Sequence, residues 1–343
     1  MNLRQLPHYL RHLDWYLREH RPMPLCSDLG RDLPLPDLQH AKVVWPRTYS
    51  WTRAPSRLDP IRKALSRLLP VEVSDVAEGH VAWRSKGGFP VPIERQAAIG
   101  SLCNPVGPYD IRGEIFEIHR GARVVRCAFD YSDYPIVSTA IQGEVDLYFK
   151  CVAPPADLAS NVRKIGYFPR NPSLLAKARA KVLRSAPEKR LGIYGRFGAW
   201  TDSQSLRAAV VEALQGSSLD FTGGFAVSIY PAYLKEIMSA RVALHLPGQG
   251  PLSYRMVEAM ALGTVVVSPK VACAFPEDLL DGVHYVALND DGSNVVEVCG
   301  HLLRDADRRQ SIAERAMVFF DRNFSTESMA RRILRTTLEP GGS

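Results

Sequence analysis

The apolar residues of this chain fall into short runs that predict strands, separated by stretches with the three- and four-residue spacing of helices. In the first half, strands are predicted at residues 41–45, 71–76, 123–129 and 145–152, with a helix at 58–69. In the second half, strands at 191–195, 219–223, 240–246 and 264–269 alternate with helices at 172–185, 205–214, 231–239 and 253–262. Further helices are expected at 294–303, 306–322 and 326–337. Because the strands are apolar on both faces, the pattern predicts an α/β protein with parallel sheets covered on both sides.

The start of the chain has a different pattern. Leucines recur at three- and four-residue steps between residues 3 and 19, which predicts an amphipathic helix whose polar side is rich in arginine and histidine. We expect this helix to pack on its own domain, and the alternative is peripheral membrane contact through residues 1–20. The proline-rich stretch 22–40 is predicted to be loop.

Composition narrows the class of protein. A chain of 343 residues, 46% hydrophobic and 23% charged, is long enough for two folded domains and is not disordered. No window is apolar over the roughly 18 residues that a membrane span needs. Charged side chains interrupt the N-terminus, which argues against export and favours the cytoplasm. The six cysteines form no CxxC pair, so free thiols are expected rather than disulfides or a zinc site.

The net charge of +7 is a moderate basic excess. It fits an anionic substrate such as a nucleotide diphosphate, or an acidic membrane surface, and it is too diffuse to predict nucleic-acid binding. Basic residues concentrate between Arg163 and Arg196, where the single acid is Glu188. Two interpretations stay open for this stretch: a solvated linker helix, or a positive wall beside an anion-binding cleft.

The most informative segment is 240–269, which reads as a buried strand, a glycine-rich loop, a helix and another buried strand. Ser253 is a suitable N-cap for the helix, and Gly263 stands where the helix end requires a left-handed residue. Gly248 and Gly250 let the backbone of the loop approach a ligand closely. Because a helix N-terminus presents unpaired N–H groups and partial positive charge, the sequence predicts an anion site there.

Two charged residues on this helix need an explanation. Arg255 lies in the first turn, where the helix dipole disfavours a cation unless an anion such as a phosphate is bound. Glu258 lies about one turn after Tyr254 on an otherwise apolar helix and is suited to accept hydrogen bonds from ribose hydroxyls. The alternative is an ordinary surface ion pair between the two charges.

These residues carry a family resemblance. The run Glu258 to Gly263, followed by the valine-rich 264–267, resembles the donor-binding signature of GT-B-fold glycosyltransferases such as the glycogen-synthase-like enzymes. The triplet Ser253 to Arg255 is similar to the exostosin-type transferases. The resemblance implies two Rossmann-like domains facing each other across a cleft. It also implies a ribose contact from Glu258 and diphosphate contacts from Ser253 and Arg255, with Tyr254 beside them.

One position departs from the family pattern. Many retaining members have a glutamate eight positions before the ribose-binding one, and this chain has Gly250 there. The stereochemical outcome therefore stays open.

Weaker resemblances extend the match over about residues 190–338. The 193–197 strand and loop place Arg196 where an arginine often meets the diphosphate, and 221–224 places Gly223 near the nucleobase. The 319–329 stretch resembles the pattern before a final helix that crosses back to the first domain. The implied domains are an acceptor-side domain at 1–170, a nucleotide-sugar-binding domain at 171–325 and the crossing helix at 326–343.

Sugar transfer also requires a base and a charge-stabilising site. Asp130 and Asp133 follow the 123–129 strand and are the candidate catalytic bases, because ligands collect at the carboxyl ends of parallel strands. The alternative for either is a helix cap, and His119 and Asp110 are further candidates. His245 is either a sugar contact or a buried, satisfied histidine. No metal site is predicted, and the acids of 289–292 read as a solvated turn.

The predicted function is metal-independent transfer of a hexosyl or pentosyl group from a UDP- or GDP-type sugar to an acceptor hydroxyl. No cofactor beyond the nucleotide-sugar co-substrate is expected, and the acceptor is a glycan, a lipid-linked molecule or a small molecule. Three alternatives remain: a UDP-sugar 2-epimerase-type isomerase of the same fold, a non-catalytic anion- or nucleic-acid-binding protein, and an inactive transferase domain that serves as a scaffold.

Overall fold

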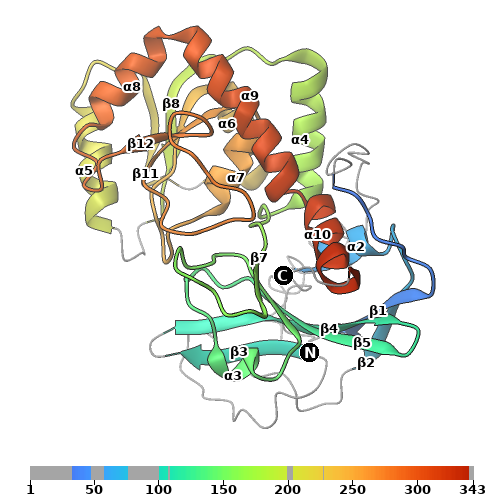
Figure 1. Ribbon diagram of the computed structural model, residues 1–343. Coiled ribbons are helices and arrows are strands. Elements are labelled where there is room, and N and C mark those ends of the chain that lie inside the picture. Colours follow the sequence, from blue (N-terminus) through green and yellow to red (C-terminus); the bar gives the residue numbers. More distant parts are fainter. Residues whose placement is uncertain are drawn as a thin grey trace, which may run out of the picture.

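The computed structural model describes residues 33–47, 58–75, 100–106, 109–198, 204–226 and 228–339. These residues form two sheets with helices packed on them, and the predicted α/β fold with two sheet-bearing units is confirmed (Figure 1). The predicted N-terminal helix and the membrane contact through 1–20 lie outside the described residues. Within them, no helix combines the length and apolar character required to cross a bilayer.

The C-terminal sheet is entirely parallel, with the strand order β12-β11-β10-β8-β9. Its strands are β8 (Leu191–Arg196), β9 (Phe221–Gly224), β10 (Ala240–Leu244), β11 (Val265–Pro269) and β12 (Val286–Leu288). The helices of this unit are α4 (Pro172–Ser185), α5 (Gln204–Gln215), α6 (Tyr230–Ser239), α7 (Tyr254–Ala261), α8 (Val295–Arg304) and α9 (Ala306–Asn323). Val242 packs with α5 and α8 while its neighbour Ala243 belongs to the cluster of α6 and α7, so helices cover both faces as predicted.

The N-terminal sheet is mixed, in contrast to the parallel sheet that we predicted. Its order is β2-β1-β4-β5-β6-β7, with β3 paired to β4. The elements are β1 (Ala41–Arg47), α2 (Asp59–Leu65), β2 (Val71–Asp75), β3 (Gly100–Val106), β4 (Tyr109–Arg120), β5 (Arg123–Asp130), α3 (Thr139–Gln142), β6 (Leu147–Lys150) and β7 (Val162–Lys164). Strand β4 is antiparallel to β1, β3 and β5, and a tight turn with Gly121 at a φ of +58° joins it to β5.

The last helix, α10 (Thr326–Leu338), lies beside α2 rather than on the C-terminal sheet (Figure 1). An ion pair between Arg67 and Glu327 (3.1 Å) and a hydrogen bond from Arg120 to the carbonyl of Leu338 (3.3 Å) attach it to the N-terminal unit. The division of the chain into domains at 170 and 325 stays a prediction.

Backbone segments from the two units touch directly. A Cβ at Gly166 would lie 1.4 Å from the carbonyl oxygen of Asn323, and Ala153 forms an isolated antiparallel bridge with Ala274. A Cβ at Gly250 would lie 1.6 Å from the carbonyl oxygen of Asp133. No side chain fits at Gly166 or Gly250, so both glycines are required for the close approach of the two units.

Helix α7 is anchored at its C-terminal end. Arg179 of α4 donates to the carbonyl of Ala261 (2.6 Å) and pairs with Asp321 (2.7 Å), which places a cation at the negative end of the helix dipole. Gly263 has a φ of +64°, as predicted for the residue that ends this helix. Met256, Val257 and Met260 are fully buried. This packing fixes the position of the opposite end of α7, which faces the carboxyl edge of the sheet.

Candidate functional site

A cavity of about 260 Å³ lies at the carboxyl edge of the C-terminal sheet. Its walls come from the end of β8 (196–198), from residues between 226 and 233 at the start of α6, and from the first turns of α7. Arg170, just before α4, completes the lining. In open parallel sheets this edge is where ligands bind.

Ser253 occupies the N-cap position of α7, as predicted, but its side chain makes no capping hydrogen bond. Its Oγ atom is buried and has no hydrogen-bond partner among the described residues. Since Ser253 lines the cavity, its hydroxyl at the positive end of the helix dipole is available to a bound anion.

Arg255 extends from the first turn of α7 against the loop after β8. One guanidinium nitrogen, Nη2, donates to the carbonyl of Arg196, and the group lies 4.7 Å from the centre of the Phe197 ring. Its Nε and Nη1 atoms are buried and have no partner among the described residues. The structure shows no ion pair between Arg255 and Glu258 in the described chain, so the alternative of a surface ion pair is wrong.

Glu258 lines the cavity although only 1% of it is exposed. Its Oε1 accepts hydrogen bonds from the hydroxyl of Tyr230 (2.6 Å) and from the main-chain N–H of Arg170 (3.0 Å). Burial raises the pKa of this carboxyl, and the hydrogen bonds from Tyr230, Tyr233 and Arg170 oppose the rise. These donors fix the orientation of the carboxyl group.

Arg196 also lines the cavity, and its guanidinium is already paired. It forms two hydrogen bonds with Glu236 of α6, from Nη2 (2.7 Å) and Nε (2.9 Å), and the hydroxyl of Tyr194 donates to the same carboxylate (2.8 Å). A phosphate contact by Arg196 therefore has to be shared with Glu236.

Tyrosines supply much of the cavity wall, and sequence reasoning did not select them. Tyr230 and Tyr233 of α6 line the cavity with ring centres 5.7 Å apart, and Arg170 lies 5.6 Å from the centre of the Tyr230 ring. Tyr254, which the sequence analysis placed at the donor site, also lines the cavity. Its ring centre lies 5.4 Å from that of Tyr167. The only sequence signal for the α6 tyrosines was their place at the start of a helix that follows a strand end.

His245 lies directly after β10, fully buried, and does not line the cavity. Its Nδ1 lies 2.9 Å from the hydroxyl oxygen of Ser268, which also lies 2.7 Å from the carbonyl oxygen of Pro269. Burial, followed by the charges of Arg255 and Arg207, lowers the pKa of His245 to about 3, so the ring is neutral. Its Nε2 has no partner among the described residues. A sugar contact by His245 stays a prediction.

The three glycines predicted at the donor site, Gly223, Gly248 and Gly250, lie close to other parts of the protein. Gly223 has a φ of +139°, and a Cβ there would lie 2.0 Å from the carbonyl oxygen of Gly195 on the neighbouring strand. A Cβ at Gly248 would lie 3.3 Å from Nη2 of Arg207, and Gly250 packs on Asp133. None of the three lines the cavity, and a ligand contact by any of them stays a prediction.

The two candidate bases lie in different surroundings. Asp130 is fully buried, and its carboxylate accepts from Tyr148 (2.6 Å), Ser132 (2.6 Å) and Lys150 (2.9 Å). Lys150 is equally buried, and removing one partner of such a pair typically costs about 3–5 kcal/mol. Nothing in this geometry lets Asp130 reach an acceptor, so we do not retain it as a base.

Asp133 lies where the two units meet and is only partly buried. Its Oδ1 accepts a hydrogen bond from the hydroxyl of Tyr167 (2.8 Å), and Tyr167 contacts the cavity-lining Tyr254. The following helix α3 is capped by Ser138, so neither aspartate is its N-cap and that alternative is wrong.

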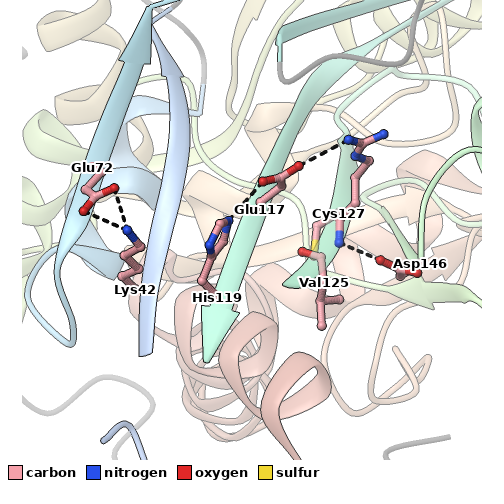
Figure 2. Close-up of polar contacts among 8 residues, drawn as sticks. Lys42, Glu72, Glu117, His119, Val125, Cys127 and Asp146 are labelled. Atoms are coloured by element: carbon pink, nitrogen blue, oxygen red, sulfur yellow. Dashed lines mark hydrogen bonds and ion pairs between the residues drawn. The ribbon is translucent and has the colours of Figure 1, made fainter. Parts of the chain in front are cut away.

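The two further polar candidates, His119 and Asp110, belong to β4. His119 of β4 contacts Glu117 (3.0 Å), which also pairs with Arg126 (3.3 Å), on the N-terminal sheet near the Lys42–Glu72 ion pair (Figure 2). The side chain of Asp110 lies outside the described residues. Over the described ranges, no group of three His, Cys, Asp or Glu side chains is placed to hold a metal ion.

The basic stretch from 163 to 196 divides into two parts. Lys177, Lys181 and Arg184 are exposed on α4, as expected for a solvated helix. Arg170 and Arg196 line the cavity, as expected for a positive wall. The solvated-helix interpretation holds for the exposed residues of α4, and anion binding by Arg170 and Arg196 stays a prediction.

The profile of the family described as "Glycosyl transferase-like" matches residues 163–335, about half of the chain, and this confirms the resemblance predicted from 240–269. None of the curated proteins is detectably similar in sequence.

Solved structures show a distant likeness. A crystal structure of Anabaena HepE in complex with UDP-glucose matches 56% of this chain and 64% of its own, at 16% identity and a TM-score of 0.36. Sucrose-phosphate synthase from Thermosynechococcus elongatus matches 62% of this chain and 66% of its own, at 15% identity and a TM-score of 0.41. The chain thus spans less than two thirds of the length of either.

Proposed function

The chain belongs to the glycosyl transferase-like family, and from this premise we propose that it transfers a sugar from a nucleotide diphosphate sugar to an acceptor hydroxyl. The observation that carries the proposal is the set of buried hydrogen-bond donors at the start of α7. Ser253 Oγ and the Nε and Nη1 atoms of Arg255 have no partner among the described residues, although both residues line a cavity. Unpartnered buried donors are costly unless a ligand satisfies them, and a diphosphate offers several acceptor oxygens.

The donor is expected to lie along α7. Its diphosphate would accept from the first-turn N–H groups, Ser253 and Arg255, with Arg196 sharing its charge between the phosphate and Glu236. Glu258 would accept from the ribose hydroxyls, and Tyr254 would pack beside them. These cations and the helix dipole can offset the negative charge that develops on the leaving diphosphate, which supports transfer without a metal ion.

Asp133 is the base that we propose for the acceptor hydroxyl. It comes from the opposite side of the interface, and its hydrogen bond with Tyr167 orients the carboxylate. A base must lie within hydrogen-bond reach of the hydroxyl that it deprotonates, and Asp133 is the candidate whose surroundings permit this. We propose that the transferred group is a hexosyl or pentosyl group and that the acceptor is a glycan, a lipid-linked molecule or a small molecule. A cytoplasmic location is also proposed.

Binding of UDP tests the donor site. Since a ligand that binds only the native state raises the melting temperature, UDP should do so for the wild type. Arg255→Ala should lose that increase while remaining folded. Arg184→Ala, which removes an exposed arginine of α4, is the matched control and should keep it. Asp133→Asn should also bind UDP but lose transfer by about 10²–10⁴-fold.

An Arg255→Ala protein that responds to UDP like the wild type would reject the site. Conversion of a UDP-sugar in the absence of any acceptor would instead indicate an epimerase.

A further inference from the structure

Arg207 of α5 is buried behind the cavity, with 4% of its surface exposed. Its guanidinium bridges two loops that follow neighbouring strands. Nη1 donates to the carbonyl of Gly198, after β8, at 2.9 Å, and Nη2 donates to the carbonyl of Leu246, after β10, at 3.3 Å. Arg207 therefore connects the carboxyl ends of the two central strands beside the cavity.

The ring of Phe197 contacts both Arg207 and Arg255. The guanidinium carbon of Arg207 is 5.6 Å from the ring centre, and that of Arg255 is 4.7 Å away. Arg255 also donates to the carbonyl of Arg196. The loop 196–198 is thus held by two cations, through its carbonyl groups at both ends and through the aromatic ring between them.

This arrangement brings two like charges together inside the protein. Neither Arg207 nor Arg255 forms an ion pair with an acidic residue in the described part of the chain. Burial, followed by the charge of Arg255, lowers the pKa of Arg207 to about 10. A bound anion would offset the repulsion between the two cations, so the pair favours a negatively charged ligand. Gly248 fits the same arrangement, because a side chain there would press on Arg207.

We propose that Arg207 is a positioning residue for the donor diphosphate. It holds the loop 196–198 and, through Phe197, keeps the guanidinium of Arg255 at the N-terminus of α7. This inference rests on the proposed function, because it assumes that Arg255 receives the diphosphate. Arg207 itself does not line the cavity and so acts through its neighbours.

The test uses Arg207→Lys in the full chain, with UDP as the probe in calorimetric titrations. Lysine keeps the charge but loses the planar contact with Phe197 and one of the two carbonyl hydrogen bonds. We expect UDP to bind about tenfold more weakly, a change equivalent to one lost hydrogen bond with a charged group. Uridine, which has no phosphate, serves as the second probe, and its affinity should not change.

Arg309→Lys is the matched control. Arg309 also donates to two main-chain carbonyls, those of Leu302 and Leu303 at the end of α8, and it does not line the cavity. The same exchange there should lower the melting temperature without changing UDP affinity. Because Arg207 acts through Arg255, its substitution should weaken UDP binding much less in an Arg255→Lys background than in the wild type.

The outcomes separate the two proposals. If the wild type and Arg207→Lys bind UDP equally well, the positioning role is overturned and the donor site stands. The same holds if Arg207→Lys loses as much affinity for uridine as it loses for UDP. If effects of the Arg207 and Arg255 exchanges simply add, Arg207 does not act through Arg255. A wild-type protein that binds neither UDP nor GDP would overturn the proposed function and this inference together.

Discussion

At the scale of single residues, Glu258 lowers the stability of the native protein near neutral pH while it is positioned to bind a ligand. It is buried at the cavity and accepts from Tyr230 and from the main chain of Arg170. Because burial raises its pKa, the native protein holds this proton more tightly than the unfolded chain does. Its contribution to stability is therefore greatest below the ordinary pKa of glutamate and is lost as the pH rises through the raised value.

Glu258→Gln should remove this dependence. The amide carries no charge to bury and its oxygen can still accept from Tyr230, so the variant should unfold at a higher temperature than the wild type near neutral pH. UDP should bind about tenfold more weakly, because an amide is a poorer acceptor for ribose hydroxyls. Thermal melts across the pH range, with and without UDP, measure both effects.

Glu212→Gln, on the exposed surface of α5, is the control and should change neither. A Glu258→Gln protein that is less stable than the wild type near neutral pH would show that the carboxylate is a structural requirement rather than a cost.

At this scale the sequence identified Arg255 and Glu258 correctly as cavity residues, because both were anomalous on their own helix. It did not identify Glu236, Tyr230 or Tyr233, since nothing in their local pattern differs from an ordinary amphipathic helix. It placed Asp130 at a strand end, as found, but had no means to show the buried Lys150 that occupies its carboxylate.

At the scale of elements, α7 is a helix whose N-terminus is left open. An N-cap serine normally stabilises its helix through a side-chain hydrogen bond worth about 1 kcal/mol. Ser253 makes no such bond, whereas Ser325 at the start of α10 accepts from the N–H of Ser328 (3.1 Å). The two serines therefore provide a matched pair for one substitution.

Ser253→Ala should leave the free energy of unfolding almost unchanged, because no capping bond is lost, and should weaken UDP binding. Ser325→Ala should lower the free energy of unfolding by about 1 kcal/mol or more, because the hydrogen bond to the carbonyl of Asp321 (2.8 Å) is lost with the cap, and should leave UDP binding intact. Urea denaturation and UDP titration of both variants measure the two quantities. Equal destabilisation by both substitutions would mean that Ser253 caps α7 in solution and is not reserved for a ligand.

Most elements of both units were predictable: β1, β2, β5, β6 and α2 lie at the expected places in the first half, whereas β3, β4, β7 and β12 were missed. The predicted helix at 172–185 coincides with α4, and β8, β10 and β11 begin or end within two residues of the expected bounds. Strand β4 was missed because charged residues such as Glu114 and Glu117 interrupt its apolar run. Strands β7 and β12 are each three residues long, which is too short for a periodic signal.

At the scale of the whole molecule, the site lies where the two units meet. Arg170 donates to Glu258, Asp133 packs on Gly250, and Tyr167 connects Asp133 to Tyr254. These contacts join residues that are far apart in sequence. No local sequence pattern predicts these contacts, because each depends on how one unit is placed against the other.

The central claim is that a diphosphate binds at the start of α7. A crystal structure of the protein with UDP tests it most directly. We expect phosphate oxygens within hydrogen-bond distance of the Ser253 hydroxyl and the Arg255 guanidinium, with the ribose beside Glu258. A nucleotide bound elsewhere, with the donors of Ser253 and Arg255 still unpartnered, would contradict it.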